Sequence, residues 1–221
     1  MTKYEFKPDK FSSHSKIINL VKPHSIVLDV GCAQGFLGKE LIKKGCIVYG
    51  IDSNESSVKE ALNFYKKVWL KDVNDVDLEL SGHHFDYIIF GDILEHVPDP
   101  ENVLHSFKKL LKPGGKIIVS TGNIANIYIR LSLLLGFFNY TKRGILDKTH
   151  LHLFTLKSLK ELLSKNGFTI QKINTTPIPF PLMFPKLVDS FVLKTIYYLY
   201  HLLTKIWARL FAFQFVILAK K

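Results

Sequence analysis

An acid and three glycines stand together where this sequence could bind a ligand. In VLDVGCAQGFLG, residues 27–38, an apolar run ends around Asp29 and leads into glycines 31, 35 and 38. Glycine lets a ligand approach the backbone and permits backbone angles that other residues avoid. A carboxylate and a glycine turn between a buried strand and a helix therefore predict a nucleotide-binding turn.

The spacing of these glycines discriminates between cofactors. Dinucleotide sites use G-x-G-x-x-G to place a pyrophosphate on a helix N-terminus, whereas this turn reads G-x-x-x-G-x-x-G. Short-chain reductases would also have Tyr-x-x-x-Lys, and no tyrosine of the chain is followed by lysine four residues later. The pattern disfavours an NAD-dependent reductase, which we keep as the rival enzyme.

Two further acids follow the next two predicted strands. Asp52 lies about 20 residues beyond the first glycine, where a carboxylate can accept both ribose hydroxyls. Asp72 follows the third strand. A lone aspartate at a strand end is more often a helix cap or a surface charge. Three in phase with three strands predict a ligand site, because ligands of parallel sheets collect at the carboxyl ends of strands.

Apolar runs and helical patterns must position these residues. The expected strands are 26–30, 47–51, 68–70, 87–90, 117–120, 167–173 and 210–221. The expected helices between them are 36–44, 54–64, 100–111 and 155–166. Strands that alternate with helices predict an α/β protein with a parallel sheet. Ser53 or Asn54 can cap the second helix, and KPGG at 112–115 ends the third.

The ordered motifs carry a family resemblance. VLDVGCAQG, GID, LKD, FDYIIFGDILEHVPDP and LLKPGGKIIVS resemble the class I S-adenosylmethionine-dependent methyltransferases over about residues 25–168. DILEHVPDP and ILDKTHLHLFT are most similar to its small-molecule group, the quinone-biosynthesis O-methyltransferase type (type 11/23), and to relatives near polysaccharide genes. The resemblance implies a Rossmann-like, doubly wound, seven-stranded sheet, mostly parallel with an antiparallel last strand.

The resemblance also implies S-adenosylmethionine as cofactor. Asp29 and the backbone of residues 31–35 would face its methionine part, and Asp52 its ribose. Asp72 with Val73 would frame the adenine, and Asp92 with Ile93 would line the floor near the sulfonium. The residues expected to bind the cofactor are Asp29, Gly31, Cys32, Gly35, Asp52, Ser53, Asp72, Val73, Asp92 and Ile93. Where many relatives have GCGxG, this chain has Ala33 and Gln34, and Ala33 should still fit.

Methyl transfer to a hydroxyl would need a base beside the aligned reactants. Histidine is the usual base, with a pKa near 6.5. We favour His150, at the end of an insertion expected to return over the site, with His96 second. His96 could instead make a structural hydrogen bond, and His150 and His152 could form a short strand with one histidine packed. His105 falls in a lysine-bearing helix pattern and is assigned to the surface.

The acceptor side is less defined. Asp92, Glu95 and His96 could ligate a divalent ion, but two carboxylates and one histidine are a weak signal, so no metal ligand is assigned. The (Asp/Asn)-Pro-Pro-(Tyr/Phe) motif of methyltransferases that act on base amines is absent. An oxygen acceptor on a small, lipid-linked or glycan-related molecule is therefore favoured.

Two insertions are more apolar than loops should be. Residues 123–155 are expected to form a lid over the acceptor, and 177–210 an apolar, basic helical insertion with one helix over 185–210. Charges interrupt both, so neither is a good spanning helix. The second shows a polar stripe of Lys186, Ser190, Lys194, Tyr197, His201, Lys205 and Arg209. Such a helix could pack on the domain or a dimer partner, or lie at an anionic membrane surface.

Composition bounds the remaining expectations. The 221 residues predict a single domain, 1–221, and two cysteines without a secretion signal indicate a cytoplasmic protein. The net charge of +11 falls mostly on helix faces, and we expect no nucleic-acid partner. The expected partners are a small-molecule acceptor and one of two surfaces. These are the anionic inner face of a membrane and a second copy of the chain. A membrane-bound module that binds cofactor without catalysis is the alternative function.

Overall fold

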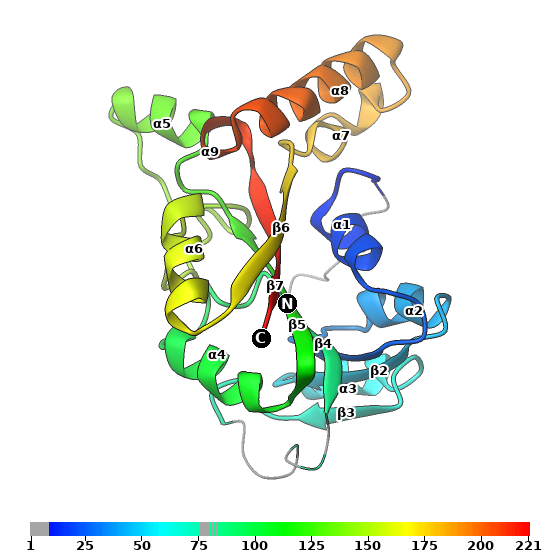
Figure 1. The fold of residues 1–221 in the computed structure, drawn as a ribbon. Coiled ribbons are helices and arrows are strands. Elements are labelled where there is room, and N and C mark those ends of the chain that lie inside the picture. The colour runs from blue at the N-terminus through cyan, green and yellow to red at the C-terminus, as the bar shows by residue number, and fades with distance from the viewer. Residues whose placement is uncertain (1–8, 76–79, 81, 83) are drawn as a thin grey trace.

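The computed structural model describes residues 9–75, 80, 82 and 84–221. It contains one seven-stranded sheet in the order β3-β2-β1-β4-β5-β7-β6 (Figure 1). The strands are β1 (Ile26–Val30), β2 (Ile47–Asp52), β3 (Lys67–Leu70), β4 (Phe85–Gly91), β5 (Leu111–Gly122), β6 (Thr169–Thr176) and β7 (Gln214–Lys220). The first five are parallel, and β7 runs antiparallel to both β5 and β6. The expected mostly parallel sheet with an antiparallel last strand is confirmed.

Helices cover both faces of this sheet (Figure 1). One face packs against α1 (Ser13–Leu20), α2 (Phe36–Ile42) and α3 (Glu55–Ala61), and the other against α4 (Pro100–Lys109) and α6 (Leu156–Lys165). The two apolar clusters arise because successive side chains of a strand point to opposite faces. The sequence analysis did not predict α1, whose Ser12 cap accepts a hydrogen bond from Ser15 N at 3.2 Å.

Two predicted boundaries of the helices change in the structure. Asn54, rather than Ser53, caps α3, and its side-chain oxygen accepts from Ser57 N at 2.9 Å. KPGG does not end α4, which already stops at Lys109. It lies inside β5, where the pairing with β4 skips from Leu111 to Lys116. Residues 112–115 therefore lie opposite the single residue Asp86, and the three extra residues are accommodated as an irregularity of the strand.

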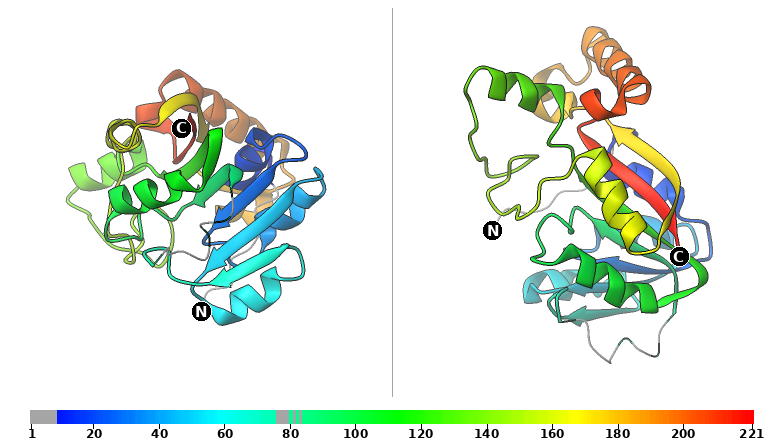
Figure 2. Two further views of the ribbon diagram at one scale, coloured as in Figure 1. Left: turned by 60° about the horizontal axis from the view of Figure 1, so that its bottom comes forward. Right: turned by 60° about the vertical axis from the view of Figure 1, so that its left-hand side comes forward.

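The helices of the two insertions lie at one end of the molecule, above the ends of β6 and β7 in Figure 1 and in the right view of Figure 2. The first contains α5 (Ile127–Leu134). The second contains α7 (Phe180–Met183), the 3-10 helix η2 (Pro185–Leu187), α8 (Phe191–Ile206) and α9 (Ala208–Phe211). A single helix over 185–210 was the wrong prediction. Ser190, before α8, is extended, and Trp207, between α8 and α9, has non-helical angles. No helix among the described residues is long and apolar enough to cross a membrane.

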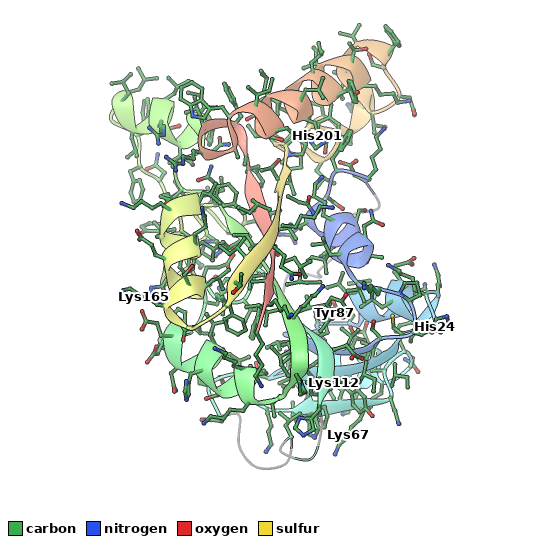
Figure 3. All side chains as sticks on the ribbon, viewed as in Figure 1. His24, Lys67, Tyr87, Lys112, Lys165 and His201 are labelled. Atoms are coloured by element: carbon green, nitrogen blue, oxygen red, sulfur yellow. The ribbon has the colours of Figure 1, made fainter. Side chains whose placement is uncertain are left out.

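The polar stripe of the second insertion is divided between the interior and the surface. Tyr197 and His201, in its middle, are buried rather than exposed. The Tyr197 hydroxyl donates a hydrogen bond to Asp9, and the His201 ring stacks on Phe11 with centroids 4.1 Å apart. In Figure 3, His201 lies on the side of α8 that faces the body of the molecule. Polar side chains thus attach α8 to the N-terminal segment.

Candidate active site

The glycine turn lies between β1 and α2, at the carboxyl edge of the sheet. Its backbone has positive φ at Gly31 (69°), Ala33 (45°) and Gly35 (84°). The amides of Gly31 and Cys32 both donate to Ile51 O, at 2.8 and 3.0 Å, which ties the turn to β2. A Cβ on Gly31 would lie 2.1 Å from Ile93 Cδ1. Glycine here therefore lets the ends of β1 and β4 approach each other at the point where the strand order reverses.

Asp52 fixes the far side of this turn from the end of β2. Its two carboxylate oxygens accept from Ala33 N and Asn54 N, both at 2.8 Å. A carboxylate oxygen can accept two hydrogen bonds, so each oxygen retains one acceptor position. Two ribose hydroxyls match that remaining capacity. The neighbouring Ser53 is exposed.

Asp29 lies beneath the turn and is almost fully buried. Its Oδ2 accepts a hydrogen bond of 2.6 Å from the Tyr65 hydroxyl, which itself accepts from Gly38 N at 3.1 Å. Burial raises the pKa of the Asp29 carboxyl to about 7, the Tyr65 hydrogen bond opposes this, and the charge of Asp52 adds to it. The sequence analysis missed Tyr65, because nothing in a single tyrosine after a helical pattern shows that it folds back under the turn.

Two side chains of the glycine turn, Cys32 and Gln34, have different surroundings. Cys32 is buried, and a Cβ on Gly50 would lie 2.7 Å from its Sγ. Burial raises the pKa of this thiol well above its ordinary value, so Cys32 offers the site its backbone only. The side-chain oxygen of Gln34 is buried and has no hydrogen-bond partner. Such an orphaned acceptor fits a ligand with a hydrogen-bond donor, such as the amino group of S-adenosylmethionine.

Asp92 forms the floor of the site at the end of β4. Its φ is 57°, a conformation that aspartate tolerates better than most residues. Its Oδ1 accepts from Ser120 Oγ at 2.7 Å and its Oδ2 from Gln214 Nε2 at 2.9 Å. Ser120 and Gln214 were not predicted, because only the pairing of β5 with β7 brings position 214 beside Asp92. Ile93, as expected, lies against the glycine turn.

Glu95 connects the floor to the first insertion. Its backbone carbonyl accepts from Leu151 N at 2.8 Å and His152 N at 3.1 Å, which holds the end of residues 123–155 over β4. Its carboxyl is buried, and Oε2 has no hydrogen-bond partner. Burial raises the pKa of Glu95 to about 8, the Asp92 charge adds to this, and hydrogen bonds involving Thr121 and Gly122 oppose it. Glu95 is therefore largely protonated at neutral pH.

This raised pKa predicts a pH-dependent stability. The folded protein keeps a proton on Glu95 that the unfolded chain releases above an ordinary pKa of 4.5, so the free energy of unfolding falls as pH rises from 4.5 to about 8. Glu95→Gln cannot ionise, so its stability should decline less between about pH 5 and about pH 9. Thermal unfolding of both proteins measures this. The exposed Glu101→Gln is the control, and equal slopes for Glu95→Gln and wild type would contradict the assignment.

His96 and His150 meet beside this floor. Their ring centroids are 4.7 Å apart, at an interplanar angle of 73°. Burial lowers the pKa of His96, and the neighbouring His150 lowers it further, while Thr149, Asp147 and Asp92 act in the opposite direction. Two imidazoles this close disfavour a doubly charged pair. The structure therefore brings together the two histidines that the sequence analysis named.

The hydrogen bonds of these rings determine which nitrogen is free. His150 Nδ1 lies 3.0 Å from Ile145 O, and His96 Nδ1 lies 3.3 Å from Thr149 O. A carbonyl only accepts, so we assign the proton to Nδ1 in both rings, and Nε2 is left as the proton acceptor. His152 Nε2 lies 3.1 Å from Pro98 O. Residues 150–152 form no strand, so the alternative of a short strand was wrong.

The remaining expected site residues lie at the end of β3. Asp72 is exposed, and its Oδ1 accepts from Asn74 N at 2.8 Å and Asn74 Nδ2 at 2.7 Å. Val73 is partly buried against the core. Their role toward an adenine stays a prediction. Within the described part of the chain, no group of three or more His, Cys, Asp or Glu side chains could hold a metal ion.

Comparisons with known proteins agree with this geometry. Residues 10–173 match the family described as "Methyltransferase domain". The ubiquinone biosynthesis O-methyltransferase of Coxiella burnetii is 38% identical over 128 residues, covering 55% of this chain and 54% of that protein. The corresponding Vibrio cholerae protein is 34% identical over 115 residues, covering 50% and 46%. The chain thus spans about half the length of the curated relatives it matches.

Solved structures share the fold over nearly the whole chain. A SAM-dependent methyltransferase from Archaeoglobus fulgidus has a TM-score of 0.62 at 21% identity, covering 94% of this chain and 90% of that one. Magnesium protoporphyrin IX methyltransferase from Synechocystis PCC 6803, solved with bound SAH, has a TM-score of 0.63 at 17% identity, covering 95% and 82%. The match of residues 10–173 shows that the chain belongs to the methyltransferase domain family, and the solved structures show that its seven-stranded sheet has the class I S-adenosylmethionine-dependent fold.

Proposed function

We propose that this protein is an S-adenosylmethionine-dependent O-methyltransferase acting on a small acceptor. The observation that carries the proposal is the contact between the rings of His96 and His150, next to the floor residue Ile93, whose carbonyl accepts from His96 N at 2.9 Å. A hydroxyl acceptor needs a base of this kind. The similarity to ubiquinone biosynthesis O-methyltransferases supports oxygen as the methylated atom.

The residues of the turn fit the cofactor. Asp52 would accept the ribose hydroxyls with its two remaining acceptor positions, and the unpaired Gln34 oxygen would accept from the methionine amino group. Asp29, held by Tyr65, supports the turn from below. When bound, S-adenosylmethionine supplies an electrophilic methyl group on a sulfonium.

His150 is the proposed base. Its Nδ1–H donates to Ile145 O, which orients the ring and directs the basic Nε2 away from that carbonyl. Nε2 would accept the proton of the acceptor hydroxyl, whose oxygen takes the methyl group as the methyl–sulfur bond of the cofactor breaks and S-adenosylhomocysteine leaves. His96, 4.7 Å away by ring centroid, is the second candidate. Backbone hydrogen bonds to Glu95 hold the loop that carries His150. This loop is the part of residues 123–155 that we propose as the lid over the acceptor.

Replacing Asp52 tests the cofactor site. Asp52→Ala is expected to weaken S-adenosylmethionine binding by about 1 to 3 kcal/mol, because two ribose hydroxyls lose a charged acceptor. Calorimetry of wild type and variant measures the difference, with the exposed Glu60→Ala as the charge-matched control. Unchanged affinity in Asp52→Ala would remove Asp52 from the site. NADH is expected not to bind.

A methyl-transfer assay distinguishes an active methyltransferase from a module that only binds the cofactor. The full chain is incubated with methyl-labelled S-adenosylmethionine and with either the lipid extract or the water-soluble extract of cells. The expected result is label in a methyl ether from one extract, identified by mass spectrometry. Cofactor binding without transfer to either extract would favour the non-catalytic module, and label on nitrogen or carbon would overturn the O-methyltransferase assignment.

A further inference from the structure

Most of the exposed large hydrophobic side chains of the described residues gather at the end formed by the two insertions. We call this surface the apolar end and define it as residues 127–140 and 182–207. Its most exposed members include Leu134 (80% exposed), Phe191 (82%) and Ile206 (81%). Soluble monomers rarely expose a contiguous apolar surface of this kind without a partner for it.

The two halves of the apolar end are joined by buried amides. Asn123 Nδ2 donates to Ala212 O at 2.9 Å, and Asn126 Nδ2 donates to Ala212 O at 2.8 Å and to Phe211 O at 3.2 Å. Both asparagines are fully buried. The start of α5 is therefore held against α9, and Figures 1 and 2 show α5 and α8 at the same end of the molecule.

The orientation of α8 is set by its polar side. Tyr197, His201 and Thr204 face inward, where Tyr197 bonds Asp9 and Thr204 bonds Thr175 at 2.8 Å between hydroxyl oxygens. In Figure 3 side chains on the opposite side of α8 project away from the body. The helix thus turns uncharged polar groups inward and presents most of its large apolar groups outside together with Lys194 and Lys205, the reverse of a helix that covers a core.

The charges around the apolar end indicate what covers it. Residues 123–140 and 177–211 carry five exposed Lys and Arg side chains and one acid, Asp189. The basic residues are Arg130, Lys186, Lys194, Lys205 and Arg209. Lys194 is 3.3 Å from Asp189, which leaves most of this positive charge without an acidic neighbour in the same segments.

We propose that the apolar end docks on an anionic lipid bilayer without crossing it. Its apolar and aromatic side chains, among them Trp207 and Tyr128, suit the boundary between headgroups and acyl chains, and its cations suit anionic headgroups. A second copy is disfavoured as the occupant. A symmetric dimer brings the same surface against itself and would place these cations opposite one another.

The docked orientation would turn the acceptor side of the site toward the bilayer. Gln214, the first residue of β7, follows the apolar end directly and contacts Asp92 in the site floor. Gly122, paired with Gln214, ends β5 at the same edge of the sheet. This part of the inference rests on the proposed function, whereas the lipid contact itself does not.

Flotation with vesicles tests the lipid contact. The full chain is mixed with vesicles of phosphatidylcholine alone or of equimolar phosphatidylcholine and phosphatidylglycerol. We expect binding to the anionic vesicles that added salt weakens. A basic residue near an anionic leaflet contributes about a fivefold change in partitioning, so four changes should lower binding by about 600-fold. The four changes are Lys186→Gln, Lys194→Gln, Lys205→Gln and Arg209→Gln.

Matched variants separate lipid contact from general effects. Phe191→Glu with Ile206→Glu should also abolish binding, whereas Leu62→Glu, at a 51% exposed site on α3, should not. The charge control changes four exposed lysines elsewhere, Lys43→Gln, Lys59→Gln, Lys109→Gln and Lys165→Gln, and should bind far better than the first quadruple variant. Cofactor affinity is measured on the wild type and on every variant to confirm that it folds. A wild type that binds cofactor but not vesicles then contradicts only the lipid contact, whereas a wild type that binds vesicles but no cofactor contradicts only the proposed function.

Three outcomes would overturn the proposal. The first is no binding of the wild type to either vesicle. The second is equal binding by the Phe191→Glu, Ile206→Glu variant and the wild type. The third is a dimer by light scattering that those two changes dissociate, with no vesicle binding, because the apolar end would then be an interface between copies.

Discussion

His150→Ala is expected to slow methyl transfer by about 10² to 10⁴ in a single turnover while the cofactor binds with unchanged affinity. The reason is that Nε2 of His150 would take the proton of the acceptor and would not touch the cofactor. The acceptor for this measurement is the extract fraction that takes up labelled methyl.

Two further histidine variants make this result specific. His105→Ala changes an exposed histidine on α4 and should leave the rate as it is. His96→Ala removes the ring that lies against His150, so a moderate loss is expected from a less well oriented base. A slow His96→Ala beside a normal His150→Ala would reverse the assignment of the two histidines.

Gly38→Ala is expected to lower the free energy of unfolding by about 3 to 5 kcal/mol. A Cβ at this position would lie 2.3 Å from Tyr65 Cε2 and 2.4 Å from Tyr65 Cζ, so the ring must move. Overpacking costs about 1 to 3 kcal/mol. Loss of the 2.6 Å bond from Tyr65 to the buried Asp29 carboxyl adds about 1.5 to 3 kcal/mol. Denaturant unfolding measures the change, and cofactor affinity should fall with it.

Gly91→Ala is the matched control for this substitution. The nearest atoms to a Cβ at Gly91 are at 3.8 and 3.9 Å, which is ordinary van der Waals contact. Its effect on stability should therefore stay within about 1 kcal/mol. Equal destabilisation by the two changes would mean that Tyr65 does not limit the space at position 38.

The candidate site could be predicted from sequence only where it follows the strand ends. Asp29, Asp52 and Asp92 occur in chain order at the ends of β1, β2 and β4, and a parallel sheet places such ends on one edge. Tyr65 and Gln214 follow no such rule. Each reaches the site by a contact between segments at least 36 residues apart, 65 with 29 and 214 with 92.

The amphipathic pattern of the second insertion shows the same limit. The sequence contains a polar stripe beside a wide apolar face, and that pattern alone left open whether the helix packs on the domain, packs on a partner or lies at a membrane surface. In the structure Tyr197 and His201 are buried, because Asp9 and Phe11 come from the other end of the chain to meet them. Which side of a helix faces inward therefore depends on which side chains from the rest of the chain can contact it.

The sequence by itself determined the order and type of most elements, the glycine turn and the family, because periodicity and strand-end motifs are local properties. The structure confirmed the seven-stranded sheet and its antiparallel β7. Only the tertiary structure decided the pairing of His96 with His150, the partner of Asp29 and the outward apolar face of α8. These depend on contacts between distant segments, whose geometry is set by the packing of the whole chain and by no local pattern.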